Sequence, residues 1–210
     1  MKRDIDICTD LITPDVAASL IPAFAAAYGM AVSVADSIDF LGRWELREQI
    51  LPHLKNWAVE YELHRRAIAG TIPFECTVVP NIRKNHNHIE LRKNGFVLTV
   101  SQTHSIKSMP RDCIFRNDHC MDGQLALAGF ESGESNQSKE IYAILTHGCG
   151  LTSPAFILCG IPNPNMSSWA KHEDLYQITN GITVIDTSPV NDDIVLDYRE
   201  QIKEHAREIQ

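Results

Sequence analysis

The sequence predicts an α+β fold, in which an antiparallel β-sheet packs against N-terminal helices and a C-terminal amphipathic helix. Helical hydrophobic spacing dominates residues 1–70, strand-like alternation dominates residues 71–186, and residues 190–210 are again helical in pattern. The strand-like segments follow one another without long helical crossovers, which argues against a doubly wound parallel sheet. No internal repeat or linker divides the chain, so we expect a single domain over residues 1–210.

A central hairpin at about residues 86–104 is the clearest structural signal. Asn94-Gly95 favours a two-residue type I′ turn, which requires positive φ at both positions. That turn predicts the pairs Lys93–Phe96, Arg92–Val97, Leu91–Leu98, Glu90–Thr99, Ile89–Val100 and His88–Ser101. Side-chain alternation then gives one face for burial, made of Ile89, Leu91, Phe96, Leu98 and Val100. The other face is polar and carries His86, His88, Glu90 and Arg92 opposite Val97, Thr99, Ser101 and Thr103.

The polar face of this hairpin has two interpretations. An antiparallel sheet with one side in water carries such residues routinely, and we take solvation as the first expectation. In the alternative, the face binds a ligand or performs catalysis. Same-face residues two positions apart lie about 6.5–7 Å from each other, so one phosphate group could contact His88, Glu90 and Arg92 together.

The N-terminal region predicts a helix that begins at Thr13-Pro14-Asp15, with Thr13 as its N-cap. We expect it to run to about Tyr28, to kink near Pro22 and to end at Gly29. Residues 16–35 contain no charged side chain, a length that would suffice to span a membrane. Because the stretch is alanine-rich and contains proline and glycine, a buried helix is the better explanation, and no membrane is expected.

A second helix is predicted from about Arg43 to Ala69, kinked by Pro52 and ended by Gly70. Its apolar stripe, which we expect to be buried, consists of Ile50, Leu54, Trp57, Tyr61, His64 and Ile68. Further strands are expected at residues 71–79, 113–115, 140–147, 155–161 and 182–186. Residues 125–130 are undecided, and residues 131–138 are a polar loop. A rigid turn at 162–165 precedes a short helix from Ser167 or Ser168 to about Tyr176, and residues 193–209 form the terminal helix, covering the sheet or binding a partner.

Composition and missing motifs restrict the function. The formal net charge of −8 and the pI near 5.5 argue against a broad nucleic-acid-binding surface, although they permit a small basic site. The charged N-terminus has no secretory pattern, so we expect a cytoplasmic protein with reduced cysteines. Walker A, G-x-G-x-x-G, H-E-x-x-H, G-x-S-x-G and C-x-x-C signatures are all absent.

Two classes of function remain open. The first is a regulatory or accessory protein that binds a protein partner and needs no cofactor. The second is a small metal-independent nuclease, for which the candidate catalytic residues are His86, His88, Glu90, Arg92 and Ser101. Glu90 or His88 would be the base, the other histidine the acid, and Arg92 the phosphate clamp. Helices followed by an antiparallel sheet with Glu, His and Arg on one face resemble the layout of barnase-like ribonucleases. Whether the protein is an enzyme, and its oligomeric state, stay open.

A structural zinc site is a further possibility. The candidate ligands are Cys113, His119, Cys120, His147 and Cys149, since zinc takes Cys and His in tetrahedral sets. Their spacing matches no standard zinc motif, and free cysteines commonly pack as small apolar residues. Cys149 beside His147 is also a candidate nucleophile, but no orienting acid accompanies it. We therefore expect ordinary cysteines.

Overall fold

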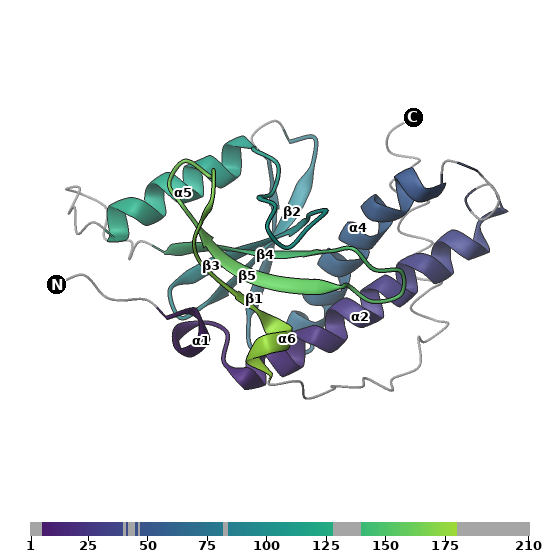
Figure 1. Ribbon diagram of the computed structural model, residues 1–210, viewed down its shortest axis with the longest axis horizontal. Helices are drawn as coiled ribbons and strands as arrows, with labels where there is room; N and C mark the ends of the chain where they lie inside the picture. Colours follow the sequence, from purple (N-terminus) through teal and green to yellow (C-terminus); the bar gives the residue numbers. More distant parts are fainter. Residues whose placement is uncertain are drawn as a thin grey trace.

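The computed structural model describes residues 6–39, 41, 45, 47–81, 84–127 and 140–179, without the side chains of residues 121–127. The fold is α+β, with a six-stranded, mostly antiparallel sheet whose strands lie in sequence order (Figure 1). The strands are β1 (Glu75–Pro80), β2 (Asn87–Lys93), β3 (Phe96–Gln102), β4 (Ile141–Gly148), β5 (Phe156–Pro162) and β6 (Trp169–Asp174). The helices are α1 (Ile7–Asp10), α2 (Pro14–Ser37), α4 (Arg47–Ile68), α5 (Ile114–Leu127) and α6 (Leu175–Ile178).

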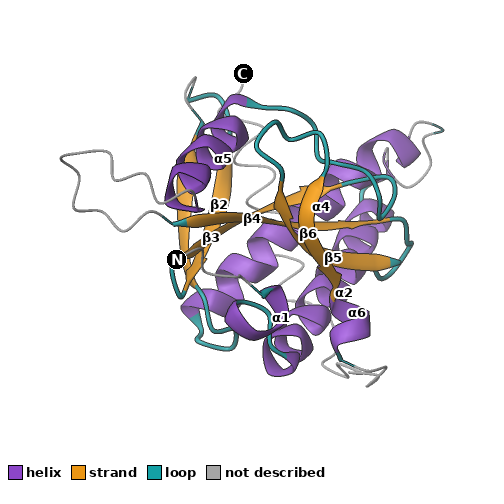
Figure 2. Ribbon diagram, turned by 60° about the vertical axis from the view of Figure 1, so that its left-hand side comes forward, coloured by secondary structure: helices purple, strands orange, loops and turns teal. Residues whose placement is uncertain are grey.

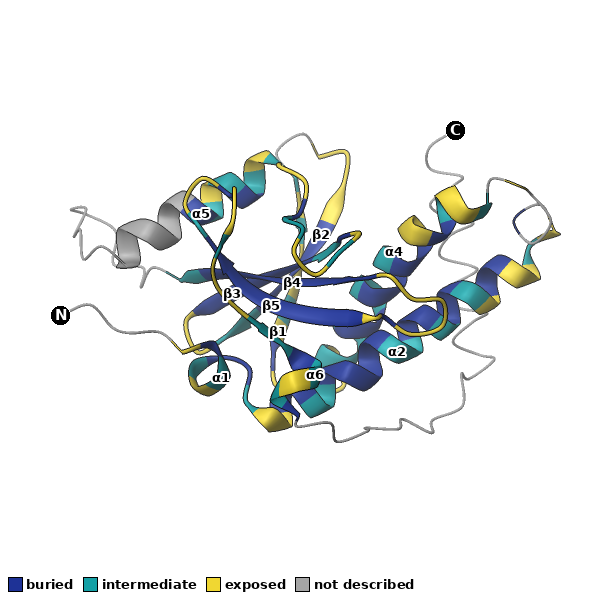
Figure 3. Cartoon of the chain, in the orientation of Figure 1, coloured by how far each residue is buried: buried dark blue, intermediate teal, exposed yellow. Residues whose placement is uncertain are grey.

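The helices cover both faces of the sheet (Figures 1 and 2). On one face α4 packs on β1, β2 and β3, while α2 packs against α4 and α6. This side holds the main core, which includes the predicted apolar face of the hairpin. On the opposite face α5 packs on β4, over a smaller core of Val97, Cys120, Tyr142, Ile144 and Met166. The buried surfaces therefore lie between the layers (Figure 3).

The predicted turn and the register next to it are confirmed. Asn94 and Gly95 have φ angles of 53° and 80°, as a type I′ turn requires. The pairs Lys93–Phe96, Arg92–Val97 and Leu91–Leu98 are present. The ladder between β2 and β3 ends at the Leu91–Leu98 pair, whereas β2 stays paired with β1 as far as Asn87.

Helix α2 confirms the predicted start and corrects the predicted end. Thr13 is the N-cap and accepts a hydrogen bond from the amide of Val16. The prediction that the helix ends at Gly29 is wrong, because the helix continues to Ser37 and buries further residues, among them Met30, Ala31 and Val34. Their burial outweighs the cost of about 1 kcal/mol for a glycine within a helix. Among the described helices, α2 is long and apolar enough to span a membrane, but 61% of its most apolar window is buried inside the protein.

The buried side of helix α4 differs from the predicted one. Leu54 is buried as expected, but Trp57 and Ile68 are 44% and 74% exposed. The buried side instead consists of Leu51, Leu54, Lys55, Ala58, Val59, Glu62 and Leu63. Helix α4 packs against α2 and the sheet. The apolar spacing in this helix fits two overlapping sides of it, so the sequence pattern alone indicated the wrong side as buried.

Three predictions in the second half of the chain fail. Residues 113–115 are not a strand: Cys113 lies in a loop and Ile114 begins α5. Since α5 connects β3 to β4, those strands are parallel, and the expectation of no helical crossover is wrong at this point. The predicted helix from Ser167 or Ser168 to Tyr176 is largely strand β6, whose Trp169 packs on Gly160, where a Cβ atom would lie 2.4 Å from the indole ring. Because residue 160 is a glycine, the Trp169 side chain can lie directly against its backbone.

The remaining strand boundaries agree closely with the sequence. Strands β4 and β5 lie where they were expected, and β1 begins a few residues after the predicted start. The predicted loop at 131–138, strand at 182–186 and terminal helix at 193–209 lie outside the described residues, as do residues 128–130 of the undecided segment.

Candidate functional site

A pocket of about 670 Å³ opens at the end of the hairpin away from the Asn94-Gly95 turn. Its walls come from α4, the start of β2, the end of β3 and the segment that leads into α5. The lining residues are Asn56, Glu60, Asn81, His86, His88, Val100, Ser101 and residues 111–116. The pocket lies beyond the Leu91–Leu98 pair, where the ladder between β2 and β3 ends, and residues from both helical layers reach it. Its volume falls within the range of about 300–1,000 Å³ that is common for small-molecule sites.

Glu60 is one of two carboxyl groups that line this pocket, the other being Asp112. It is half-buried on α4, and its Oε1 accepts a hydrogen bond of 3.1 Å from Nδ2 of Asn56. Burial raises the pKa of Glu60 to about 7, although the hydrogen bond from Asn56 and the positive charge of Arg116 act in the opposite direction. Near neutral pH the carboxyl group therefore exists in both protonation states. A pocket acid of this kind is suited to gain or release a proton.

Two arginines line the pocket on the side of α5. Nη1 of Arg116 donates to the carbonyl oxygen of Arg111 at 2.8 Å and to Sγ of Cys113 at 3.2 Å. Arg116 is 9% exposed, and its guanidinium lies 4.9 Å from the centre of the Phe115 ring. Within the described part of the chain, neither Arg111 nor Arg116 forms an ion pair with a carboxylate, and Nε of Arg116 has no hydrogen-bond partner. Their positive charge is therefore available to a ligand.

The two histidines of the polar face also line the pocket. His86 is exposed, whereas His88 is 7% exposed and stacks on Phe115, with ring centres 4.1 Å apart. Nε2 of His88 lies 3.6 Å from Oε1 of Glu90, which is too long for a hydrogen bond. Among the described residues neither ring nitrogen of His88 has a hydrogen-bond partner. Buried polar atoms without partners are rare, and they point to a site that something else completes.

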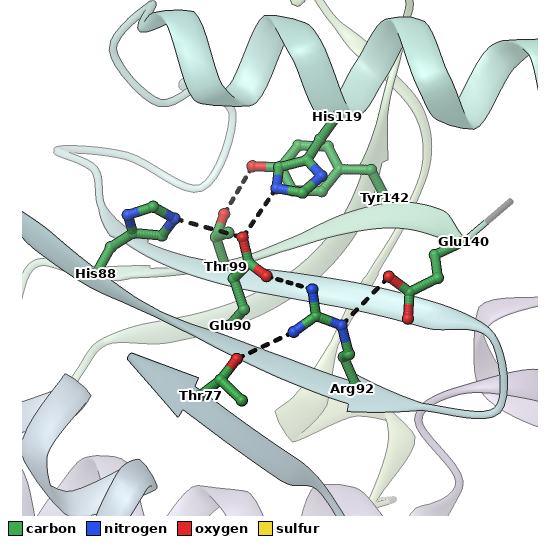
Figure 4. Close-up of polar contacts among 8 residues, drawn as sticks. All are labelled: Thr77, His88, Glu90, Arg92, Thr99, His119, Glu140 and Tyr142. Atoms are coloured by element: carbon green, nitrogen blue, oxygen red, sulfur yellow. Dashed lines mark hydrogen bonds and ion pairs between the residues drawn. The ribbon is translucent and has the colours of Figure 1, made fainter. Parts of the chain in front are cut away.

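Beside the pocket, Glu90 is the centre of a buried charge cluster (Figure 4). Its side chain accepts a hydrogen bond of 3.0 Å from Nε2 of His119 and one of 2.5 Å from Nη2 of Arg92. Arg92 also donates to Thr77 at 3.0 Å and to Glu140 at 3.2 Å. The hydrogen bond from His119, together with His88 and Arg92, holds the pKa of Glu90 well below its usual range. Glu90 is therefore a fixed anion and a poor general base.

Helix α5 is anchored to the sheet by polar groups. The His119 ring stacks on Tyr142 with centres 5.0 Å apart, and the Tyr142 hydroxyl forms a hydrogen bond of 2.6 Å with Thr99. Glu90 and Thr99 are 4% and 1% exposed. The first expectation, that this face of the hairpin is solvated, is therefore wrong. Because His88, Glu90 and Tyr142 hold α5, they also position the pocket wall that precedes this helix.

The structure divides the predicted catalytic residues into two groups. His86, His88 and Ser101 line the pocket. Glu90 and Arg92 belong to the charge cluster, where they bind each other and Glu90 also binds His119 of α5. His88 is the residue that joins the two groups, since it lines the pocket and contacts Glu90.

Three residues of the site were not found from the sequence, namely Glu60, Arg111 and Arg116, and His119 was considered only as a zinc ligand. They lie outside the hairpin, on α4 and around the start of α5. Arg116 and Cys120, one helical turn apart, face the sheet. That spacing was present in the sequence, but a polar residue at a buried position gives no hydrophobic signal.

The candidate zinc ligands do not form one cluster. His119 and Cys120 lie on the α5 side of the sheet, whereas His147 faces α2, where Nδ1 shares a hydrogen bond of 2.8 Å with the Tyr28 hydroxyl. Cys113 lines the pocket, and Sγ of Cys149 donates to the carbonyl oxygen of His104. No group of three or more possible metal ligands occurs in the described ranges. Burial lowers the pKa of His147 to about 3, so this histidine is neutral and structural.

Comparisons of the chain with models of protein families, with curated proteins and with solved structures find no match. The geometry and chemistry of the pocket are therefore the basis on which a function is proposed.

Proposed function

We propose that the protein binds a phosphate-bearing small molecule in the pocket between α4 and the start of α5. The observation that carries this proposal is the pair of arginines, Arg111 and Arg116, which line the pocket without a carboxylate partner among the described residues. Guanidinium groups match phosphate oxygens in charge and geometry, and hydrogen bonds to a charged acceptor are the stronger ones.

The rest of the lining suits such a ligand. His86 and His88 add two imidazoles, and Asn56 and Asn81 add amide groups. Val100, Ile114 and Phe115 give an apolar wall on which an uncharged part of the ligand can pack. The other acid beside the arginines, Asp112, already accepts a hydrogen bond of 2.8 Å from Asn117. Glu60 loses its charge as the pH falls below about 7, which favours an anion.

Calorimetric titration with a nucleoside monophosphate and with inorganic phosphate tests the proposal. The variants Arg111→Gln and Arg116→Gln should each weaken binding about tenfold or more, because each loses a charged hydrogen bond to the ligand. Arg111 is exposed, so its variant should fold normally even if the buried Arg116 variant does not. Arg65→Gln is the matched control, since Arg65 lies on α4 and is paired with Glu62. The proposal fails if neither probe binds, or if the control weakens binding as much.

A metal-independent nuclease is a more specific alternative for the same pocket. His86, His88 and Ser101 are present, but Glu90 and Arg92 are occupied in the charge cluster, so Glu60 would replace Glu90 as the proton acceptor. End-labelled RNA in excess EDTA is therefore one arm of the same experiment. If the wild type cleaves the RNA, and His88→Ala and the exposed-site variant His86→Ala do not, the ligand of the pocket is a phosphodiester substrate. Binding without cleavage would leave a phosphate-binding protein.

Binding of a protein partner is the second candidate, and the exposed stripe of α4 favours it. Trp57 and Ile68 are exposed and lie about three helical turns apart on nearly the same side of the helix. Large exposed apolar side chains on one face are typical of interaction surfaces. If the wild type captures a protein partner, the double variant Trp57→Gln/Ile68→Gln should recover about tenfold less of it. The control double variant Glu48→Gln/His53→Gln, on the same helix, should recover as much as the wild type. Equal recovery by both double variants would contradict this role for the stripe.

A further inference from the structure

The six cysteines of the chain lie in different environments, and all are free thiols. Cys120 and Cys159 are buried, and Cys8 and Cys76 are half-buried. Burial raises the pKa of all four thiols, that of Cys76 and of Cys120 to about 11. Since the thiolate is the nucleophilic form, these four are expected to react slowly.

Cys113 lies in a different environment, at the wall of the pocket. Its Sγ accepts a hydrogen bond of 3.2 Å from Nη1 of Arg116. Its carbonyl oxygen accepts hydrogen bonds from the amides of Arg116 and Asn117, which places Cys113 at the N-terminus of α5, a helix of 14 residues. A cationic donor and the partial positive charge of a helix N-terminus therefore both lie beside this sulfur atom.

A second feature of the pocket points to an anionic reaction partner. Arg116 is more than nine-tenths buried, lines the pocket, and has no hydrogen-bond partner at Nε among the described residues. Arg111 is exposed on the same wall. A thiol reagent that carries carboxylates would therefore be held beside Cys113, whereas a neutral reagent of the same reactivity would not.

We infer that Cys113 is a modification site that forms a mixed disulfide with an anionic disulfide of the oxidised glutathione class. The Cys113 thiol loses its proton to solvent, and its sulfur attacks one sulfur of the reagent. The S–S bond of the reagent breaks as the new S–S bond forms. One half stays attached to Cys113, and the other half leaves as a thiolate that takes up a proton. Cys113 is oxidised and the reagent is reduced, so no other reactant is needed.

The bound group would occupy the pocket. Its carboxylates would lie against Arg111 and Arg116, which are also the residues assigned to the phosphate ligand. Modification should therefore prevent ligand binding, a consequence that rests on the proposed function. The modification itself does not depend on that function, and its test has a separate readout.

Peptide mapping by mass spectrometry measures the modification rate at each cysteine of the full chain. The reagents are oxidised glutathione and the neutral hydroxyethyl disulfide. Cys113 should react at least about tenfold faster than Cys76, which is also half-buried. Cys113 should also prefer the anionic reagent over the neutral one more strongly than Cys149, which is exposed and does not line this pocket. In Arg116→Gln or Arg111→Gln this preference should fall several-fold.

Two outcomes would overturn the inference. In the first, Cys113 reacts no faster than Cys76 with either reagent. In the second, its preference for the anionic reagent equals that of Cys149 or survives both arginine substitutions. Titration of the modified protein with the nucleoside monophosphate is a separate measurement. If Cys113 is modified but the unmodified protein binds no phosphate probe, the proposed function fails and the modification site stands.

Discussion

Replacement of Glu90 by Gln is expected to lower the free energy of unfolding at pH 7 by about 3 kcal/mol, because it removes the central charge of a buried cluster. Glu90 is 4% exposed, and its carboxylate binds Arg92 and His119. Glutamine keeps the shape of the side chain, but it leaves His119 without the carboxylate it binds and leaves Arg92 with the more exposed Glu140. Urea unfolding at pH 7 measures the change.

The control for this prediction is Glu140→Gln. Glu140 also binds Arg92, at 3.2 Å, but its side chain is 37% exposed. We expect a change of less than about 1 kcal/mol, as for most exposed ion pairs. Equal effects of the two substitutions would show that burial does not strengthen the cluster.

The pH dependence of the Glu90 effect has a definite sign. The pKa of Glu90 is lowered in the folded protein from its ordinary value of 4.5, so the carboxylate contributes stability above pH 4.5. That contribution decreases as the pH falls toward the lowered pKa. The difference between wild type and Glu90→Gln should therefore be full at pH 7 and smaller at pH 4.

Replacement of Glu60 by Gln is expected to have the opposite effect and to stabilise the protein at pH 8 by about 2 kcal/mol. Burial raises the pKa of Glu60 from 4.5 to about 7, and each pKa unit corresponds to about 1.4 kcal/mol before screening by solvent. The folded protein must ionise a carboxyl group in a poor environment. Glutamine removes this requirement and keeps the acceptor for Asn56.

For Glu60 the sign of the pH dependence is reversed. Between pH 4.5 and 7 the unfolded chain releases the Glu60 proton while the folded protein retains it, so the wild type loses stability as the pH rises. The gain from Glu60→Gln should be absent below pH 4.5 and complete above pH 7. Glu48→Gln, an exposed position on the same helix, should change stability by less than about 0.5 kcal/mol at every pH. A gain that does not vary with pH would contradict a raised pKa.

These two glutamates show why the pocket and the charge cluster differ in chemistry. Glu90 has cations around it and is held ionised, so it supports the structure. Glu60 lies in the pocket wall, where the hydrogen bond from Asn56 and the charge of Arg116 do not offset the effect of burial, and its pKa is raised to about 7. A carboxyl group that lowers stability while it lines a pocket is better explained by binding or proton transfer than by folding.

The sequence by itself determined the local elements whose signals are backbone requirements or strict alternation. Thr13-Pro14 starts α2, Asn94-Gly95 makes the turn, and the alternation of β2 and β3 separates the apolar face from the polar one. These features depend on neighbouring residues alone, so a pattern of a few residues suffices to predict them. The α+β class follows from their order.

Tertiary structure decided what the polar face contacts and where the pocket lies. In the part of α5 whose side chains are described, His119 stacks on Tyr142 and binds Glu90, and these polar contacts gave no hydrophobic period that marked α5 as a helix covering the sheet. Glu60 and Arg116 meet His88 only because α4 and α5 lie on opposite faces of the sheet and both reach its open end. Polar contacts between distant segments depend on the positions of whole elements, and local sequence does not encode those positions.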